Sequence, residues 1–377
     1  MRGATVVGLS AMLGTGVFAV WTAALALAGS WLLLALLAAA VIAALNAIST
    51  ARLAMTHPES GGAYAYGRIR LNRAAGVTAG FAFVIGKSAS AAAAALTIGV
   101  YLWPEQARAV AWTAIVIALA IDLRGVVRSM RVNAVLVGIV LVVLMLVIGL
   151  GLTLESGAQV AATTAALPDA GPIAVLAGAG LLFVAFAGYA RITVLGEEVR
   201  DPVRTIPRAM LASFLIVTLV YAALAIVVLR LAQDGFIFTP APLEDIATAA
   251  APDAAWVVRV GAVLGAGAVL ISLLAGIGRT LFAMAARGDA PPPLAAVSGR
   301  SVPQRAGIVA AVLAALLVAG GRIPWALGLS AASILTYYAI AHAAAWTLPG
   351  PARRIVPALG VLGCASIVLA LVAQALR

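Results

Sequence analysis

Residues 8–18 of the chain read GLSAMLGTGVF, and they lie in a stretch without Asp, Glu, Lys or Arg that runs from Arg2 to Arg52. This stretch is long enough for two membrane crossings of about 20 residues each, with a turn near residues 27–30. Gly14 and Gly16 interrupt the first crossing. In lipid, each unpaired backbone N–H or C=O costs several kcal/mol, so an interruption needs a reason. The segment predicts a broken membrane helix.

The rest of the chain has the composition of a membrane protein. Of its 377 residues, 64% are hydrophobic and 10% are charged. In a soluble domain, about half of the residues are apolar and about a quarter are charged. Further apolar runs follow the first two crossings, at residues 74–103, 109–121, 132–154, 171–190, 209–229, 260–286, 306–320, 323–346 and 355–376. We therefore predict an all-α membrane protein with about eleven transmembrane helices.

Positive charge is distributed unevenly over the connecting segments. If the N-terminus is cytoplasmic, 16 of the 24 Lys and Arg residues fall on the inside and five on the outside. Such a bias sets orientation in membranes, so we expect a cytoplasmic N-terminus in the cell (inner) membrane. The net charge of +11 is then explained by topology, and nucleic acid is not expected as a partner.

Residues for metal or redox chemistry are scarce. The chain has one cysteine, Cys364, and two histidines, His57 and His342, too few for a zinc site or an iron–sulfur cluster. No catalytic Ser-His-Asp order and no phosphate-binding loop is apparent. We expect no enzyme, no catalytic residue, no metal and no cofactor, and no ATP-driven pump.

A second interruption follows Phe186 and Ala187, where Gly188 and Tyr189 lie inside the run at 171–190. This run begins a second set of five helices. Because five is odd, the second set enters the membrane from the opposite face, as in the inverted repeats of many secondary transporters. We expect a first repeat at residues 1–154, a second at 171–346 and an additional helix at 355–377. Taken singly, the glycines would also suit close helix packing.

Three further motifs accompany GLSAMLGTGVF: HPESGGAYAYGR at residues 57–68, FAGYARITVLGEEVRDPVRTIPRA at 186–209 and RTLFAMAARGDAPPPLAAVS at 279–298. Together they resemble the amino acid/polyamine/organocation superfamily, specifically its bacterial amino acid permeases. Most of those proteins have twelve helices, so eleven is a departure outside the ten-helix core.

The resemblance implies a five-plus-five inverted repeat with helices 1 and 6 broken, and amino acid transport by alternating access. Carried over by motif position, Gly14, Thr15 and Gly16 bind the substrate carboxylate. Backbone carbonyls near Phe186, Ala187 and Gly188 bind its ammonium. Tyr189 covers the substrate or gates it.

Lys87 lies near the middle of the third helix, where an isolated cation costs about 2.5–3.5 kcal/mol on insertion scales. One interpretation is proton coupling, in which Lys87 takes up and releases a proton as its exposure changes. Some permeases place an amine on helix 5, but residues 132–154 contain no lysine. Alternatively, Lys87 reaches helix-end carbonyls without titrating.

Other polar residues are candidates for ion pairs or for an ion-binding site. The spacing of Arg191 from Glu197 and Glu198 favours a structural or gating ion pair at the end of helix 6. Similar contacts are expected among Arg279, Arg287 and Asp289. Ser272 on helix 8 is a candidate ligand for an ion, although a lone hydroxyl commonly bonds to its own helix.

The sequence thus predicts a permease that imports neutral or broadly varied amino acids, coupled to protons or alternatively to sodium. An ion-independent amino acid exchanger is the alternative. A channel would need a polar stripe, which the helices lack. The particular amino acid, the stoichiometry and the oligomeric state stay open.

Overall fold

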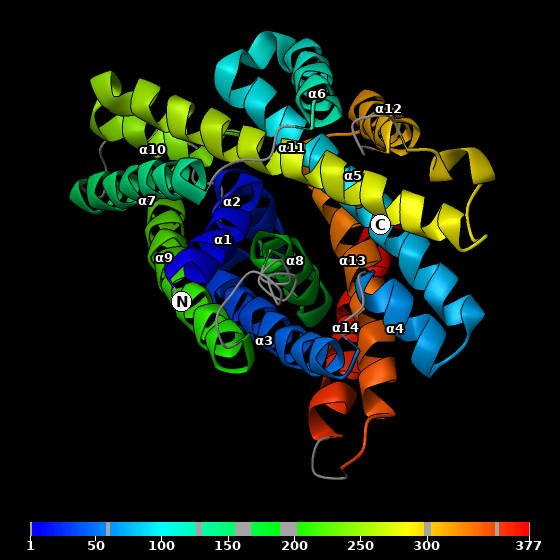
Figure 1. The fold of residues 1–377 in the computed structure, drawn as a ribbon. Coiled ribbons are helices and arrows are strands. Elements are labelled where there is room, and N and C mark those ends of the chain that lie inside the picture. The colour runs from blue at the N-terminus through cyan, green and yellow to red at the C-terminus, as the bar shows by residue number, and fades with distance from the viewer. Residues whose placement is uncertain are drawn as a thin grey trace.

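The computed structural model describes residues 2–57, 61–125, 130–154, 167–188, 202–297, 303–350 and 354–376. These ranges are helical apart from short connections (Figure 1). The longer helices are α1 (Arg2–Met12), α2 (Thr15–Ala28), α3 (Leu32–Thr56), α5 (Arg73–Leu102), α6 (Ala107–Leu123), α7 (Met130–Thr153), α8 (Pro172–Phe186), α9 (Pro202–Gln233), α11 (Ala255–Ala286), α12 (Gln304–Gly320), α13 (Ile323–Trp346) and α14 (Ile355–Ala375). The prediction of an all-helical membrane protein is confirmed.

Within these described ranges, eight helical segments are long and apolar enough to cross a membrane. The first, Gly3–Thr56, holds the two predicted crossings, which the 3-10 turn η1 (Gly29–Trp31) separates. The shorter apolar helices α8 and α12 complete the predicted set of eleven segments. Helix α8 ends at Phe186, before the predicted residue 190, because the chain turns at the second glycine interruption.

Two short helices, α4 (Gly62–Arg70) and α10 (Pro242–Ala250), lie in connections that the apolar runs do not cover. Helix α10 begins with Pro242 and carries Glu244 and Asp245 in its first turn, a pattern that favours a helix N-terminus. Helix α4 begins at Gly62 with Gly61 as its N-cap, and both glycines adopt positive φ angles.

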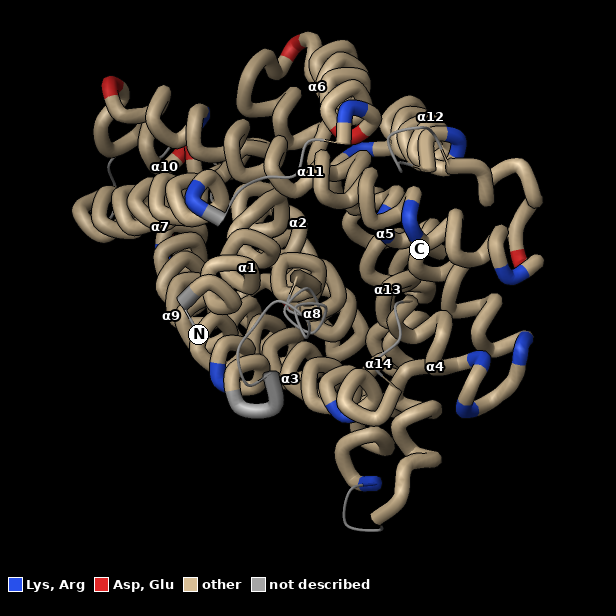
Figure 2. Tube along the Cα trace, viewed as in Figure 1, with Lys and Arg blue, Asp and Glu red and all other residues tan. Residues whose placement is uncertain are grey.

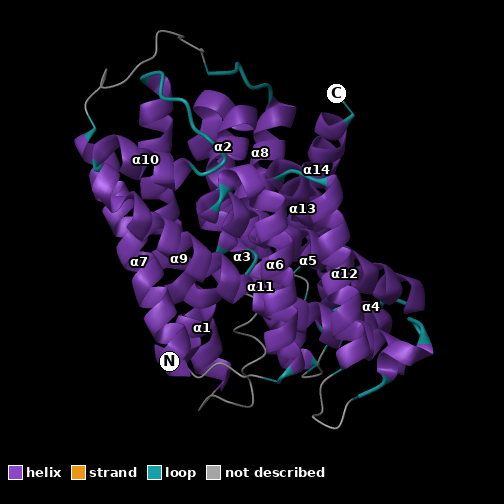
Figure 3. Ribbon diagram, turned by 90° about the horizontal axis from the view of Figure 1, so that it is seen from above, coloured by secondary structure: helices purple, strands orange, loops and turns teal. Residues whose placement is uncertain are grey.

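The helices form a bundle in which α8 packs against α2 and α3, and α5 packs against α11 and α13. In the view of Figure 3, α1 and α4 lie near one end of the bundle and α10 near the other. We call these the α4 end and the α10 end. Charged residues are sparse along the chain trace (Figure 2).

Small residues allow α5 to pack closely against its neighbours. The five residues Ala91–Ala95 are fully buried, at 0% exposure, so neighbouring backbones approach closely, as is typical of membrane helices. Large apolar side chains such as Leu37, Leu219 and Leu362 are instead exposed by 60% or more. The bundle therefore presents to its surroundings the apolar surface that lipid requires.

Candidate functional site

The first break separates α1 from α2. Helix α1 ends at Met12 and α2 begins at Thr15, with Gly14 as its N-cap in a non-helical conformation (φ −126°, ψ −135°). No side chain caps α2, so the N–H groups of its first turn have no partner within the helix. The break that the sequence predicts at Gly14 is present.

The second break lies at the end of α8. Ala187 donates its N–H to the carbonyl of Val184 at 3.3 Å, and Gly188 donates to Phe186 at 2.7 Å, so the helix stops in a tight turn. Four of the predicted residues, Tyr189, Arg191, Glu197 and Glu198, lie outside the described residues. Their predicted roles stay predictions.

The two breaks contact each other. A Cβ atom at position 16 would lie 2.5 Å from the Cα atom of Ala185. A Cβ atom at position 188 would collide with the carbonyl of Ala11. Glycine is therefore needed at both positions for the backbones to approach. The predicted residues Gly14, Thr15 and Gly16 are thus brought beside Phe186, Ala187 and Gly188.

This contact places the N-terminus of α2 beside the C-terminus of α8. A helix N-terminus carries partial positive charge and unpaired N–H groups, whereas a helix C-terminus carries partial negative charge and unpaired carbonyls. The same small region can therefore accept an anionic group on one side and a cationic group on the other.

Tyr221 of α9 connects the two breaks, and the sequence did not reveal it. Its hydroxyl lies 2.7 Å from the carbonyl oxygen of Met12 and 3.2 Å from that of Ala185, so it donates toward the last turns of both α1 and α8. Its ring packs edge-on against Phe186 at 5.0 Å. A tyrosine within an otherwise apolar run indicates that a buried hydroxyl needs a partner, but it does not indicate which segments supply one.

Thr15 and Ser272 are polar side chains near the first break. The Thr15 hydroxyl is buried and has no hydrogen-bond partner within the described part of the chain. A buried hydroxyl without a partner is costly, so Thr15 is a candidate contact for a bound ligand. Ser272 is half-buried on α11, one turn from Val269, whose side chain contacts Gly14.

Lys87 lies on α5 and is half-buried. Its Nζ atom stands 5.9 Å from the ring centroid of Phe83, one turn earlier on the same helix. The Phe83 ring in turn packs against Tyr337 of α13 at 5.3 Å. The cation is therefore on the side of α5 that meets other helices.

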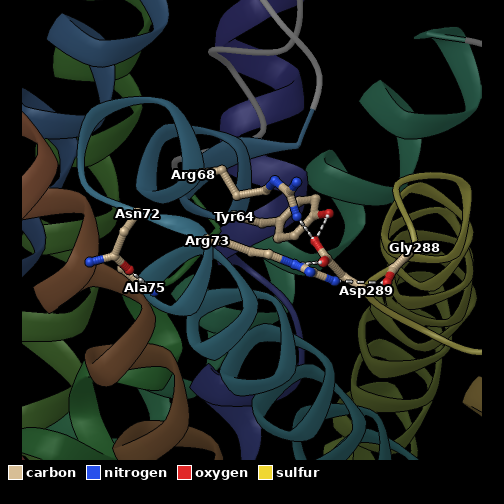
Figure 4. A network of polar contacts seen from close by, with 7 residues as sticks. All are labelled: Tyr64, Arg68, Asn72, Arg73, Ala75, Gly288 and Asp289. Atoms are coloured by element: carbon tan, nitrogen blue, oxygen red, sulfur yellow. Dashed lines mark hydrogen bonds and ion pairs between the residues drawn. The ribbon is translucent and has the colours of Figure 1, made fainter.

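At the α4 end, five residues form a polar network that we call the Asp289 cluster: Tyr64, Arg68, Arg73, Gly288 and Asp289 (Figure 4). The Asp289 carboxylate is fully buried. It accepts hydrogen bonds from the Tyr64 hydroxyl at 2.7 Å, from Arg73 Nε at 2.9 Å and from Arg68 Nη1. The partners come from α4 and the start of α5, so the cluster ties both to the end of α11.

Helix α4 is also fastened to α13. The backbone N–H of Ala63 donates to the Tyr337 hydroxyl at 2.8 Å, and Arg70 donates to the side chain and carbonyl of Thr347 at 2.9 and 2.7 Å. Arg287 adds a cation–π contact 5.6 Å from the Tyr64 ring. Helix α4 thus joins α5, α11 and α13 at this end.

The Asp289 cluster stays ionised at neutral and mildly acidic pH. Burial raises the pKa of the Asp289 carboxyl, but the hydrogen bonds from Tyr64, Arg73 and Arg68 outweigh burial, and the pKa is lowered overall. A carboxyl group whose pKa is lower in the folded state stabilises the fold at pH values above its ordinary pKa. This stabilisation is lost only as the pH falls through the lowered pKa of the folded state. The cluster is therefore not a sensor of pH near neutrality.

A groove of about 450 Å³ lies between α5 and α13, lined by residues that include Phe81, Ile85 and Ser333. Phe81 and Ile85 are more than 40% exposed, so the groove opens on the outer surface of the bundle. It is distinct from the two breaks, where the unpaired backbone groups lie, and it is not part of the candidate site.

Comparison with known proteins identifies the family. The sequence profile described as "Amino acid permease" matches residues 3–352. The chain belongs to the amino acid permease family. This confirms the resemblance seen in the motifs and makes the chain a multi-pass membrane protein. It supports amino acid transport and indicates a transporter rather than an enzyme.

Relatives of this permease are named as transporters. An "uncharacterized transporter" of Mycobacterium tuberculosis is 45% identical over 376 residues, covering 98% of this chain and 84% of its own. A branched-chain amino acid permease of Bacillus subtilis is 26% identical over 326 residues, covering 78% of this chain and 68% of its own. A methylthioribose transporter of the same organism is 27% identical over 319 residues, with coverages of 76% and 67%.

Proposed function

We propose that this permease is a secondary active transporter that imports neutral or broadly varied amino acids with protons, by alternating access. The proposal includes a five-plus-five inverted repeat divided between residues 154 and 171. It also includes a location in the inner membrane with the N-terminus and the α4 end in the cytoplasm. The excess of Arg and Lys in the segments assigned to that side supports this orientation.

The observation that carries the proposal is the meeting of the two helix breaks. In this proposal the N-terminus of α2, at Gly14, Thr15 and Gly16, binds the carboxylate of the amino acid, and the Thr15 hydroxyl, which has no partner among the described residues, joins it. Carbonyls at Phe186 and Ala187 bind the ammonium, beside Gly188. Each charged group then lies at the helix end of opposite polarity, which is the arrangement that a zwitterion needs. Tyr189 covers the bound substrate.

Neutral substrates fit the chemistry near the breaks. Among the described residues, the acidic side chains lie near helix ends or in short connections, so the breaks themselves offer no carboxylate to a cationic side chain. The branched-chain amino acid permease among the relatives is consistent with this preference.

Uptake into proteoliposomes tests the proposal directly. We expect accumulation of radiolabelled neutral amino acids when the outside is acidic and little accumulation without a pH gradient. Sodium gradients and preloading with unlabelled amino acid are run in parallel. Accumulation that requires preloading and ignores both gradients would favour an ion-independent exchanger, and no uptake of any amino acid would refute the proposal.

Replacing Lys87 with methionine is expected to flatten the pH dependence of uptake, because methionine fills similar space but cannot carry a proton. The measurement is initial uptake rate against external pH, with wild type and the Arg108→Met variant in parallel. Arg108 is exposed near the start of α6, so its loss controls for a change of net charge. A Lys87→Met protein that keeps the wild-type pH profile would assign Lys87 to structure.

A further inference from the structure

The groove between α5 and α13 lies close to one surface of the membrane. Helix α5 begins at Arg73 and α13 ends at Trp346, and both helices are long and apolar enough to cross a membrane. The end that they share is the α4 end, because Arg70 of α4 is bonded to Thr347, the residue after Trp346. Trp346 is 44% exposed, as is typical of aromatic residues at the level of the lipid head groups.

The groove runs from this end toward the middle of the membrane. On α5 its lining extends from Val77 to Ile85, a length of about 12 Å at 1.5 Å per residue. Val77 is one turn inside Arg73. On α13 the lining includes Ala332 and Thr336. The volume of about 450 Å³ is in the range of sites that hold small molecules, about 300–1,000 Å³.

The groove faces lipid and has a closed floor. Phe81 and Ile85, which line it, are 43% and 45% exposed. Phe83 lies two residues from each of them, about 200° around the helix, and its ring packs against Tyr337 of α13 at 5.3 Å. The two helices are therefore in contact behind the groove, and the space in front of it is open to an acyl chain.

Arg70 is aligned with the α13 wall of the groove. Its guanidinium donates to the side chain and the carbonyl of Thr347 at 2.9 and 2.7 Å. Thr347 follows Thr336 by eleven residues, about three full turns of a helix, so both threonines lie on the same face of α13. The hydroxyl and the carbonyl are uncharged, so these bonds hold the Arg70 guanidinium in place without neutralising it.

The surroundings of Arg70 add positive charge. Arg68 and Arg73 both bind the one carboxylate of Asp289, so these three residues together keep a net positive charge. The Arg73 side chain is 68% exposed and starts α5 one turn before the groove. Figure 2 shows Lys and Arg positions grouped around α4. A phosphate group at this end of the groove would be held by charge-assisted hydrogen bonds.

We propose that the groove is a binding site for an anionic phospholipid, with one acyl chain between α5 and α13 and the phosphate on Arg70 and Arg73. Lipid tails are as apolar as the groove, so the apolar contact alone gives little preference for one lipid over another. The selectivity comes from the head group, because each nearby arginine favours an anionic lipid by about fivefold. The site is separate from the two helix breaks.

Native mass spectrometry of the purified, detergent-solubilised permease tests the site. Phosphatidylglycerol and phosphatidylcholine with the same acyl chains are titrated, and the dissociation constant of the first bound lipid is measured. We expect wild type to bind phosphatidylglycerol at least about tenfold more tightly than phosphatidylcholine. Arg70→Gln can still donate to Thr347 but should lower this preference about fivefold. Arg70→Lys should retain it, because an ammonium also binds phosphate.

Ala332→Phe fills the groove and should weaken phosphatidylglycerol binding while Arg70 stays in place. Two controls make the same kinds of change elsewhere, on α6: Arg108→Gln removes an exposed arginine, and Ala120→Phe adds a ring at an exposed position. Both should bind lipid like wild type. Equal affinity of wild type for the two lipids would overturn the inference, as would undiminished phosphatidylglycerol binding in either Arg70→Gln or Ala332→Phe.

Discussion

Replacement of Gly16 by leucine is expected to reduce amino acid uptake to background while the protein still inserts into the membrane. A Cβ atom at this position would already lie 2.5 Å from the Cα atom of Ala185 and 2.7 Å from its Cβ. Because one obstacle is backbone, no rotamer change relieves it, and the start of α2 has to move away from the end of α8. Gly14→Leu should act similarly, since Val269 occupies the space beside it.

The same substitution at Gly138 of α7 is the matched control. This glycine is exposed, and a Cβ atom there would meet nothing within 4 Å. Uptake should be close to wild type in Gly138→Leu and intermediate in Gly16→Ala, with all amounts normalised to the purified, reconstituted protein. Normal uptake by Gly16→Leu would show that the helix breaks are not the substrate site.

Asp289→Asn is expected to open the α4 end. The carboxylate holds Tyr64, Arg68 and Arg73 together, and hydrogen bonds to charged groups contribute about 1.5–3 kcal/mol each. Arg73 is 68% exposed, so solvent screening reduces the stabilisation that its contact with Asp289 provides. Loss of the carboxylate also leaves two guanidinium groups facing each other. We expect the conformation in which the α4 end is open to be populated about tenfold more, or higher, than in wild type.

A cysteine at position 90 would report this opening. Ser90 lies on α5 one turn beyond Lys87 and is hydrogen-bonded to Ser330 of α13 at 2.6 Å. The natural cysteine, Cys364, is fully buried, so background labelling should be low. In inside-out vesicles, a membrane-impermeant maleimide should react about tenfold faster with Ser90→Cys when Asp289→Asn is also present.

Asp253→Asn serves as the control for this experiment, because Asp253 is an exposed carboxylate in a short connection near the α10 end. It should leave the labelling rate unchanged. Equal labelling rates with and without Asp289→Asn would mean that the Asp289 cluster does not hold the α4 end closed. The pH midpoint of transport should not move in Asp289→Asn, since the lowered pKa of Asp289 keeps the group ionised near neutrality.

Much of the architecture could be predicted because membrane crossings depend on composition. Apolar runs located the helices, as for α5, where residues 74–103 were expected and Arg73–Leu102 is observed. Helix α4 was missed because it is short and polar, and its position depends on contacts with Tyr337 and Thr347 far along the chain.

The site could be predicted only where backbone chemistry leaves a local signal. Gly14, Gly16 and Gly188 are visible because glycine interrupts a membrane helix. Tyr221 is not, since nothing in its own segment indicates that it reaches α1, 209 residues away, as well as α8. The contacts of Asp289 were expected from Arg279 and Arg287 nearby, but Arg68 and Arg73 bind it, because folding brings α4 across the end of α11.

The shared hydroxyl of Tyr221 limits how the bundle can rearrange. One O–H group serves the last turns of both α1 and α8, so sliding either helix past the other forfeits a bond in an apolar interior. A motion that moves α1, α8 and α9 together as a rigid unit keeps both contacts and therefore costs less free energy. In the proposed alternating-access cycle, the hinges are then expected at the edges of that unit, and the paired helix ends are expected to keep their spacing while the surrounding helices tilt.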